Sequence, residues 1–197
     1  MANKLSNKGF TLVELLVTIV LVVILFASFG TFFVNYTTLY YGLQTDSSNS
    51  VQMTQELERI ASVLRGLTDI VSATPNSLTA YAYFSPDDTY VSLINYYVNS
   101  TNNEVLATVT PMTSNPPTGS PITSQAKTYT IISSYYQPSG GSLFSYYDVS
   151  GSLLTQPITD EKAILSISIN LSSPASHNVK GQQLNTEITI RDRKVST

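Results

Sequence analysis

The sequence predicts an α+β protein, in which a long N-terminal hydrophobic helix forms a stalk and continues into a globular head with a mainly antiparallel β-sheet. Two observations predict the helix: an apolar run extends from Phe10 to about Val34, and no proline occurs before Pro75. A third predicts the sheet. After Pro75, short segments rich in Tyr, Val and Ile alternate apolar and polar residues, as strands do.

The apolar run is long enough to cross a membrane. About 20 apolar residues, each rising about 1.5 Å along a helix, span a hydrocarbon core of about 30 Å. Lys4 and Lys8 precede the run, and the next basic residue is Arg59. Because basic residues mark the cytoplasmic flank, we expect a single-pass membrane protein whose C-terminal head lies outside the cytoplasm.

Of two common roles for such a segment, a secretory signal fits poorly and a plain membrane anchor fits better. A secretory signal would have a shorter apolar core, with small residues at a cleavage site after it. Here Ala27, Ser28 and Gly30 lie inside the run. A plain membrane anchor fits the length but leaves Glu14 unexplained, because a carboxylate in lipid is costly and is a functional candidate by default.

Residues 8–17, Lys-Gly-Phe-Thr-Leu-Val-Glu-Leu-Leu-Val, resemble the cleavage and methylation motif of type IV prepilins and type II secretion pseudopilins. The resemblance implies that a membrane peptidase removes the leader, residues 1–9, by cutting between Gly9 and Phe10 from the cytoplasmic side. It also implies that Phe10 is then N-methylated and that residues 10–34 form the transmembrane and filament-core helix, with Glu14 as a buried acid.

Physical chemistry supports a role for Glu14 in assembly. Cutting before Phe10 creates an α-amino group at the start of the helix. In a bundle of such helices, the Glu14 carboxylate of one subunit would neutralise the amino terminus of its neighbour. An unpaired buried charge is expensive, so this pairing would set the axial register of the filament. The alternative is a tolerated stray charge in an anchor helix.

The second half of the helix, residues 35–73, becomes amphipathic, and we expect it to run to about Val71. Its apolar residues recur at three- and four-residue steps, which predicts one face packed on a sheet. These residues are Leu57, Ile60, Ala61, Leu64, Leu67 and Val71. Ser72 to Asn76 would end the helix, with Pro75 as the stop.

The head, residues 74–197, is expected to contain about seven strands. Predicted strands are residues 77–84, 90–98, 104–110, 129–136, 143–148, 163–171 and 183–191. Core positions in the last two include Ile164, Ile167, Ile169, Leu184, Ile188 and Ile190. Residues 111–125 have no periodicity and many prolines, which predicts a long loop.

Parts of the head resemble a group of minor pilins that includes the J-type pseudopilins and the W-type minor pilins. The resemblance covers residues 57–59 through 78–81, a Tyr-Tyr-Asp-x-x-Gly turn at 146–151 and a closing strand with a terminal Arg-polar motif at 187–193. It implies a minor subunit, and an unassigned minor pilin is the alternative.

Residues that carry catalytic or metal chemistry are few. The sequence has no cysteine and one histidine, His177, which we expect in an exposed loop. No serine lies in a Gly-x-Ser-x-Gly elbow, and the acidic residues Asp87, Asp88 and Asp148 match no EF-hand spacing, so we interpret them as turn residues. Asp160 and Glu161 are interpreted as solvated loop. We therefore expect no enzymatic activity, no cofactor and no metal site.

Tyrosine is abundant, with 13 residues and no tryptophan. The pairs Tyr96-Tyr97, Tyr135-Tyr136 and Tyr146-Tyr147 would each place one ring on each face of a strand. The inner rings fill the core. The outer rings either bind sugars, surfaces or neighbouring subunits or reflect ordinary strand composition, which is the simpler interpretation.

These features predict a minor pilin or pseudopilin subunit of a type IV pilus-like filament, with a role in filament initiation, adhesion, motility, DNA uptake or secretion. Its partners would be the prepilin peptidase/methyltransferase, other pilin subunits, the pilus assembly platform and the membrane. Lys and Arg total only 10 and are scattered, so no specific nucleic acid is indicated. A membrane-anchored extracellular binding module that does not polymerise is the second hypothesis, and an anchored enzyme is the third.

Overall fold

The computed structural model describes residues 11–133, 135, 141–172 and 183–190, with the main chain alone for residues 45–49. Within these residues the chain divides into two units, Met1–Asp46 and Ser47–Thr197. The described elements are α-helical in the first unit, and the second combines helix with strands. The predicted α+β fold, a long apolar helix followed by a head with antiparallel sheets, is confirmed.

Helix α1 extends over Leu12–Arg65. Its apolar part, Leu12–Gln44, is long and apolar enough to cross a membrane by length and composition. Hydroxyl side chains inside this part donate to main-chain carbonyls one turn earlier: Ser28 to Ile24 at 2.9 Å and Thr31 to Ala27 at 3.0 Å. These bonds satisfy the hydroxyl groups within the helix itself, so Ser28 and Thr31 need no polar partner outside it.

The part of α1 in the second unit buries one face. Met53, Leu57, Ile60, Ala61 and Leu64 are buried in the core at three- and four-residue spacing. The predicted amphipathic stripe is therefore confirmed over these positions.

The predicted end of the helix is wrong. The helix ends at Arg65, and Asp69–Thr74 forms strand β1 rather than the last helical turn. Gly66 follows the last helical residue, and its N–H bonds to the Val63 carbonyl at 3.1 Å in a tightened final turn. Glycine is a poor helix former, while the β-branched pair Ile70-Val71 suits a strand, and pairing with the next strand supplies the main-chain partners. Val71 fits a helical stripe by spacing, but its side chain is 47 % exposed.

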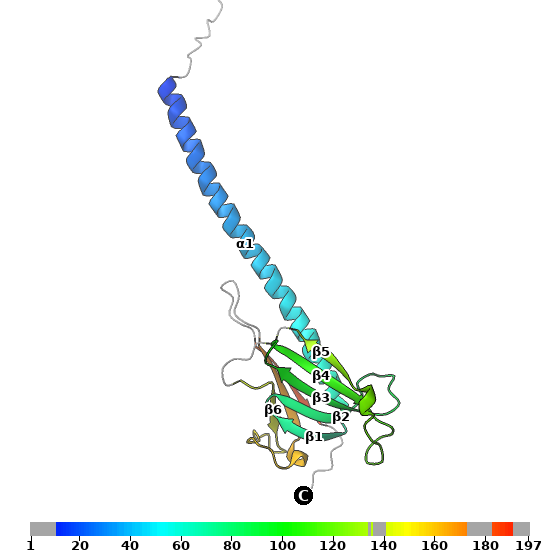
Figure 1. The fold of residues 1–197 in the computed structure, drawn as a ribbon. Coiled ribbons are helices and arrows are strands. Elements are labelled where there is room, and N and C mark those ends of the chain that lie inside the picture. Colours follow the sequence, from blue (N-terminus) through cyan, green and yellow to red (C-terminus); the bar gives the residue numbers. More distant parts are fainter. Residues whose placement is uncertain (1–10, 134, 136–140, 173–182, 191–197) are drawn as a thin grey trace, which may run out of the picture. The chain divides into compact units, whose positions relative to one another are not determined.

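The larger sheet has five antiparallel strands that follow one another in the order β1-β2-β3-β4-β5 (Figure 1). After β1, the strands are β2 (Ser77–Ala82), β3 (Ser92–Asn99), β4 (Glu104–Pro111) and β5 (Lys127–Ile132). Alternate residues of the middle strands are buried, as expected for a sheet with one covered face. They include Leu78, Ala80, Ile94, Tyr96, Val105 and Ala107.

A smaller antiparallel sheet has the order β6-β7-β8 and contains Phe144–Tyr147, Ser166–Ser172 and Gln183–Thr189. Six of the seven residues of β7 are buried, so this central strand is covered on both faces. The described residues thus contain eight strands rather than about seven, because β1 was not predicted. Of two 3₁₀ turns, η1 (Thr123–Gln125) lies in the predicted loop, and η2 (Glu161–Ala163) includes Ala163, which was predicted to begin a strand; that strand, β7, begins at Ser166.

Both sheets and the second part of α1 contribute to a single hydrophobic core. The sheets meet at the turn between β1 and β2. The Phe144 N–H donates to the Pro75 carbonyl at 2.9 Å, and the Tyr146 hydroxyl donates to the Thr74 carbonyl at 2.9 Å. These bonds anchor β6 to a hairpin that lies far earlier in the chain.

Candidate functional site

The start of α1 forms a reciprocal cap between Thr11 and Glu14. The Glu14 N–H donates to the Thr11 hydroxyl at 3.2 Å. In return the Thr11 N–H and hydroxyl lie 3.3 and 3.4 Å from Glu14 Oε2 as donors. This is the capping-box arrangement, in which two otherwise unpaired main-chain donors are satisfied.

The cap places Glu14 in the first turn of α1, where the partial positive charge of the helix N-terminus favours a carboxylate. Glu14 is the only charged residue between Phe10 and Gln44. Donors from its own chain reduce the cost of holding this carboxylate in apolar surroundings, because a bare charge there would have no partner. The two contacts of the carboxylate, at 3.3 and 3.4 Å, are long, so it keeps capacity for a stronger partner.

Sequence reasoning identified Glu14 but missed Thr11 as its partner. The signal was present, since Thr-x-x-Glu before an apolar run is the sequence pattern of a capping box. Gly9 and Phe10, the predicted cleavage site and methylated residue, lie outside the described residues, as do Lys4 and Lys8.

The apolar part of α1 exposes large side chains along its length. Leu25, Phe26 and Phe33 are 68 %, 73 % and 59 % exposed. An apolar surface of this extent needs lipid or other protein to cover it. The helix is therefore compatible with a membrane anchor.

The start of the chain matches a known motif. Residues 4–29 match the family described as the prokaryotic N-terminal methylation motif, which is typical of type IV pilins. No curated protein and no solved structure matches the chain. The match confirms the predicted resemblance of residues 8–17, supports a pilin-like substrate of prepilin peptidase, and places the chain with a structural rather than an enzymatic motif family.

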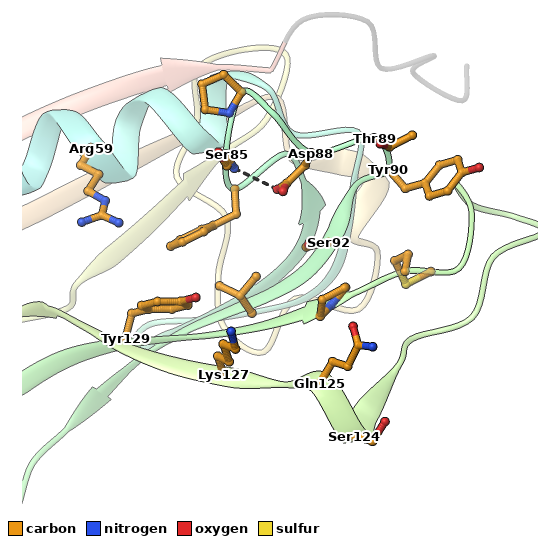
Figure 2. Close-up of a pocket in the computed structure, with 15 residues that line it drawn as sticks. Arg59, Ser85, Asp88, Thr89, Tyr90, Ser92, Ser124, Gln125, Lys127 and Tyr129 are labelled. Atoms are coloured by element: carbon orange, nitrogen blue, oxygen red, sulfur yellow. Dashed lines mark hydrogen bonds between the residues drawn. The ribbon is translucent and has the colours of Figure 1, made fainter.

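The head contains a second candidate site, an open groove of about 930 Å³ (Figure 2). Arg59 contributes from α1, Phe84 and Asp88 from the connection between β2 and β3, and Lys127 and Tyr129 from β5. Lys127 pairs with Val109 and Tyr129 with Ala107, both of which are buried. Paired residues share a face of a sheet, so Lys127 and Tyr129 lie on the covered face, at the edge where cover ends.

An ordered stack lines one side of this groove. The Arg59 guanidinium carbon lies 5.6 Å from the centre of the Phe84 ring. The Phe84 ring in turn stacks on Tyr129, with centroids 5.1 Å apart and planes inclined by 27°. The stack holds the guanidinium by cation–π attraction and leaves its N–H groups available at the edge.

Two of the three aspartates interpreted as turn residues, Asp88 and Asp148, hold their turns through side-chain hydrogen bonds, as predicted. Asp88 Oδ2 accepts from the Ser85 N–H at 2.9 Å. Asp148 Oδ1 accepts from the Ser150 hydroxyl at 2.6 Å and the Ser152 N–H at 2.9 Å, and these bonds hold the pKa of Asp148 below its usual value. Asp160 accepts from the Lys162 N–H at 3.0 Å at the start of η2.

Within the described ranges, no group of three or more His, Cys, Asp or Glu side chains lies close enough to hold a metal ion. His177, expected in an exposed loop, lies outside the residues that the structure describes, as do Arg191 to Arg193 of the second resemblance.

The predicted division of tyrosine pairs between two faces is confirmed for two pairs. Tyr96 and Tyr146 are buried, each 1 % exposed, while Tyr97 and Tyr147 are half-buried. Tyr135 is also buried, and its neighbour Tyr136 is among the residues not described. The groove uses other tyrosines, Tyr129 and Tyr90, which sequence reasoning did not single out.

Proposed function

We propose that this protein is a minor pilin or pseudopilin, a subunit of a type IV pilus-like filament. One observation carries the proposal: a prokaryotic methylation motif at residues 4–29 overlaps the start of a 33-residue apolar helix segment, whose first turn contains Glu14 in a capping box with Thr11. A membrane anchor alone requires neither the motif nor Glu14.

In this proposal residues 1–9 are a cytoplasmic leader, cut between Gly9 and Phe10 by a prepilin peptidase that also methylates Phe10. Residues 10–34 cross the membrane and then form the filament core. The remainder of α1, up to Arg65, leads into an extracytoplasmic head. The subunit moves from the membrane into a pilus or pseudopilus with other pilins on the assembly platform.

Glu14 has two successive partners in this scheme. Before assembly its carboxylate accepts from the Thr11 N–H and hydroxyl of its own chain. In the filament it accepts from the new amino terminus at Phe10 of a neighbouring subunit. That charged donor makes a stronger bond than the neutral ones, and the exchange favours one axial register.

A minor rather than a major subunit is supported by the head. It carries a long proline-containing loop and an open polar groove, whereas a major subunit packs against itself many times through a compact surface. Its role would lie in filament initiation, adhesion, motility, DNA uptake or secretion, without an enzymatic step of its own.

The deciding experiment is intact-mass and N-terminal peptide analysis of the protein from its native membrane, with and without the prepilin peptidase. We expect a mature chain that begins with N-methylated Phe10 only when the peptidase is present. Gly9→Val should block the cut, because a bulky side chain there prevents the close approach of the protease to the backbone that glycine allows, and Asn7→Ala should not. An uncut chain in cells with active peptidase would overturn the proposal and leave a non-polymerising anchored module.

A further inference from the structure

The groove of the head has a composition that the filament role does not explain. Its two cations, Arg59 and Lys127, are both exposed. No carboxylate in the described part of the chain lies within salt-bridge distance of either, although an Arg65–Glu58 pair exists further along the same helix. Among the described residues of the lining, Asp88 is the only acid, and it is engaged by the Ser85 N–H. A chain of net charge −3 thus keeps a locally positive hollow.

The guanidinium of Arg59 is held in a defined position, and the backbone of Lys127 is fixed by its strand. Arg59 lies in α1, and its guanidinium carbon is 5.6 Å from the centre of the Phe84 ring. Lys127 lies on a strand, two residues from Tyr129 and therefore on the same face. Figure 2 shows these side chains extending from opposite walls toward the same space. A ligand with a negative group would meet at Arg59 a donor that needs little reordering, which lowers the entropic cost of binding.

The rest of the lining is aromatic and hydroxylic. Tyr129 and Tyr90 are 38 % and 44 % exposed, so parts of both rings face the solvent. Ser85, Thr89 and Ser124 supply hydroxyl groups, and Gln125 supplies an amide. Aromatic faces suit the apolar C–H faces of sugar rings, while hydroxyls and amides pair with sugar hydroxyls in both hydrogen-bonding directions.

We propose that this groove binds an acidic oligosaccharide, in which sugar rings contact Tyr129 and Tyr90 and carboxylates pair with Arg59 and Lys127. The volume of about 930 Å³ is sufficient for more than one sugar ring. This assignment goes beyond filament assembly and does not depend on cleavage after Gly9.

Two other anionic ligands fit less well. Nucleic acid binding draws its affinity from many phosphate contacts, and two cations in a chain of net charge −3 supply too few. An acidic peptide would satisfy the cations, and its main chain would pair with the lining hydroxyls, but its acidic side chains offer no ring face to lie on Tyr129 and Tyr90. Binding experiments can distinguish the three ligands. All three are negatively charged, but the oligosaccharide alone combines carboxylates with sugar rings that carry several hydroxyl groups.

The experiment is calorimetric titration of the full-length protein in detergent micelles with a tetramer of galacturonic acid, a tetramer of glucuronic acid and the methyl ester of each. We expect one or both acidic tetramers to bind and the uncharged esters to bind at least about tenfold more weakly, since hydrogen bonds to charged groups are the stronger class. Arg59→Gln, Lys127→Gln and Tyr129→Ser should each weaken binding by about tenfold.

Matched controls lie outside the groove. Arg65→Gln on the same helix and Lys162→Gln should leave binding unchanged, and circular dichroism should show that every variant is folded. Failure of both acidic tetramers to bind would overturn the assignment, as would equal binding by the Arg59→Gln variant. Equal binding of a glutamate tetrapeptide or of single-stranded DNA would show a site for anions in general and would also overturn it. The binding experiment does not require cleavage after Gly9. Its outcome can therefore be interpreted whether or not the processing experiment supports the proposed function.

Discussion

The hydroxyl of Tyr146 donates a hydrogen bond of 2.9 Å to the main-chain carbonyl of Thr74. The same hydroxyl lies 3.3 Å from the Ser77 carbonyl, on the other side of the β1–β2 turn. Tyr146 is 1 % exposed, so its ring is part of the core while its polar end closes a contact between the two sheets. A buried tyrosine usually needs such a partner, and here the partner is the turn of a distant hairpin.

Tyr146→Phe removes this bond and leaves the ring in place. We expect the free energy of unfolding to fall by about 1 to 3 kcal/mol, because the Thr74 carbonyl loses its buried donor. The measurement is urea unfolding of the full-length protein in detergent, followed by circular dichroism. Tyr147→Phe is the matched control: its ring is half-buried on the opposite face, and we expect a change within about 0.5 kcal/mol. Equal effects of the two changes would contradict the assignment.

Alkaline pH should destabilise the head. Burial raises the pKa of Tyr96 and Tyr146 well above the usual value of 10.0, although the Arg59 charge opposes the shift at Tyr96 and the Thr74 bond opposes it at Tyr146. The folded state therefore holds these protons more tightly than the unfolded state. Their contribution to stability is complete below about pH 10 and is lost as the pH rises further toward the folded pKa.

The alkaline effect is measured by chemical unfolding at a series of pH values, with phenolate absorbance recorded in parallel. We expect the free energy of unfolding to fall above about pH 10 and part of the phenolate signal to appear only on unfolding. In Tyr146→Phe the fall should be shallower. A flat profile to about pH 11.5 would show that the buried rings ionise as easily as exposed ones.

Capping and charge at Glu14 can be separated by substitution. Thr11→Ala removes the hydroxyl of the cap and should destabilise the start of α1 by about 0.5 to 2 kcal/mol, while incorporation into filaments persists. Glu14→Gln keeps an acceptor for the Thr11 N–H but removes the charge, so we expect a normal helix and loss of incorporation.

Filament incorporation is measured by the amount of protein in sheared filaments, and the helix start by hydrogen exchange at residues 14–16. Glu14→Ala, which removes both functions, should show both defects. If Glu14→Gln assembled normally while Thr11→Ala failed, capping rather than charge would be the function of this residue.

Gly119 allows close approach of two backbone segments in the loop after β4. A Cβ atom at this position would lie 1.7 Å from the Ser114 carbonyl oxygen, and main-chain atoms cannot yield cheaply. We expect Gly119→Ala to lower the free energy of unfolding by about 1 to 3 kcal/mol, measured by urea unfolding. Gly66→Ala is the control, since its Cβ would meet the Val63 carbonyl at an ordinary 3.5 Å. The prediction is wrong if both variants are equally stable.

Local patterns predicted much of this fold. The long apolar run, the stripe from Leu57 to Leu64 and the alternation within most strands were read correctly, because helix and strand periodicities depend on neighbouring residues alone. The methylation motif likewise lies within one continuous segment, residues 4–29. Capping by Thr11 could have been predicted in the same way.

The end of α1 could not be predicted by spacing, because Leu67 and Val71 fit a helical stripe as well as they fit the strand region. Asp69–Thr74 is a strand rather than a helical turn because it pairs with Ser77–Ala82. The partner strand supplies main-chain hydrogen bonds that the segment cannot make alone. The separation of the strands into two sheets was also not predicted. It depends on which strands form hydrogen bonds with each other, and the sequence of one strand does not specify its neighbour.

By itself the sequence determined the motif at the N-terminus, the apolar helix with one acid, and an antiparallel head. Only the tertiary structure brought Arg59, Phe84 and Tyr129 into one stack, and Tyr146 to the carbonyl of Thr74. The physical reason is that these contacts join segments far apart in the chain. Their formation depends on burial of a shared core, which no local periodicity encodes.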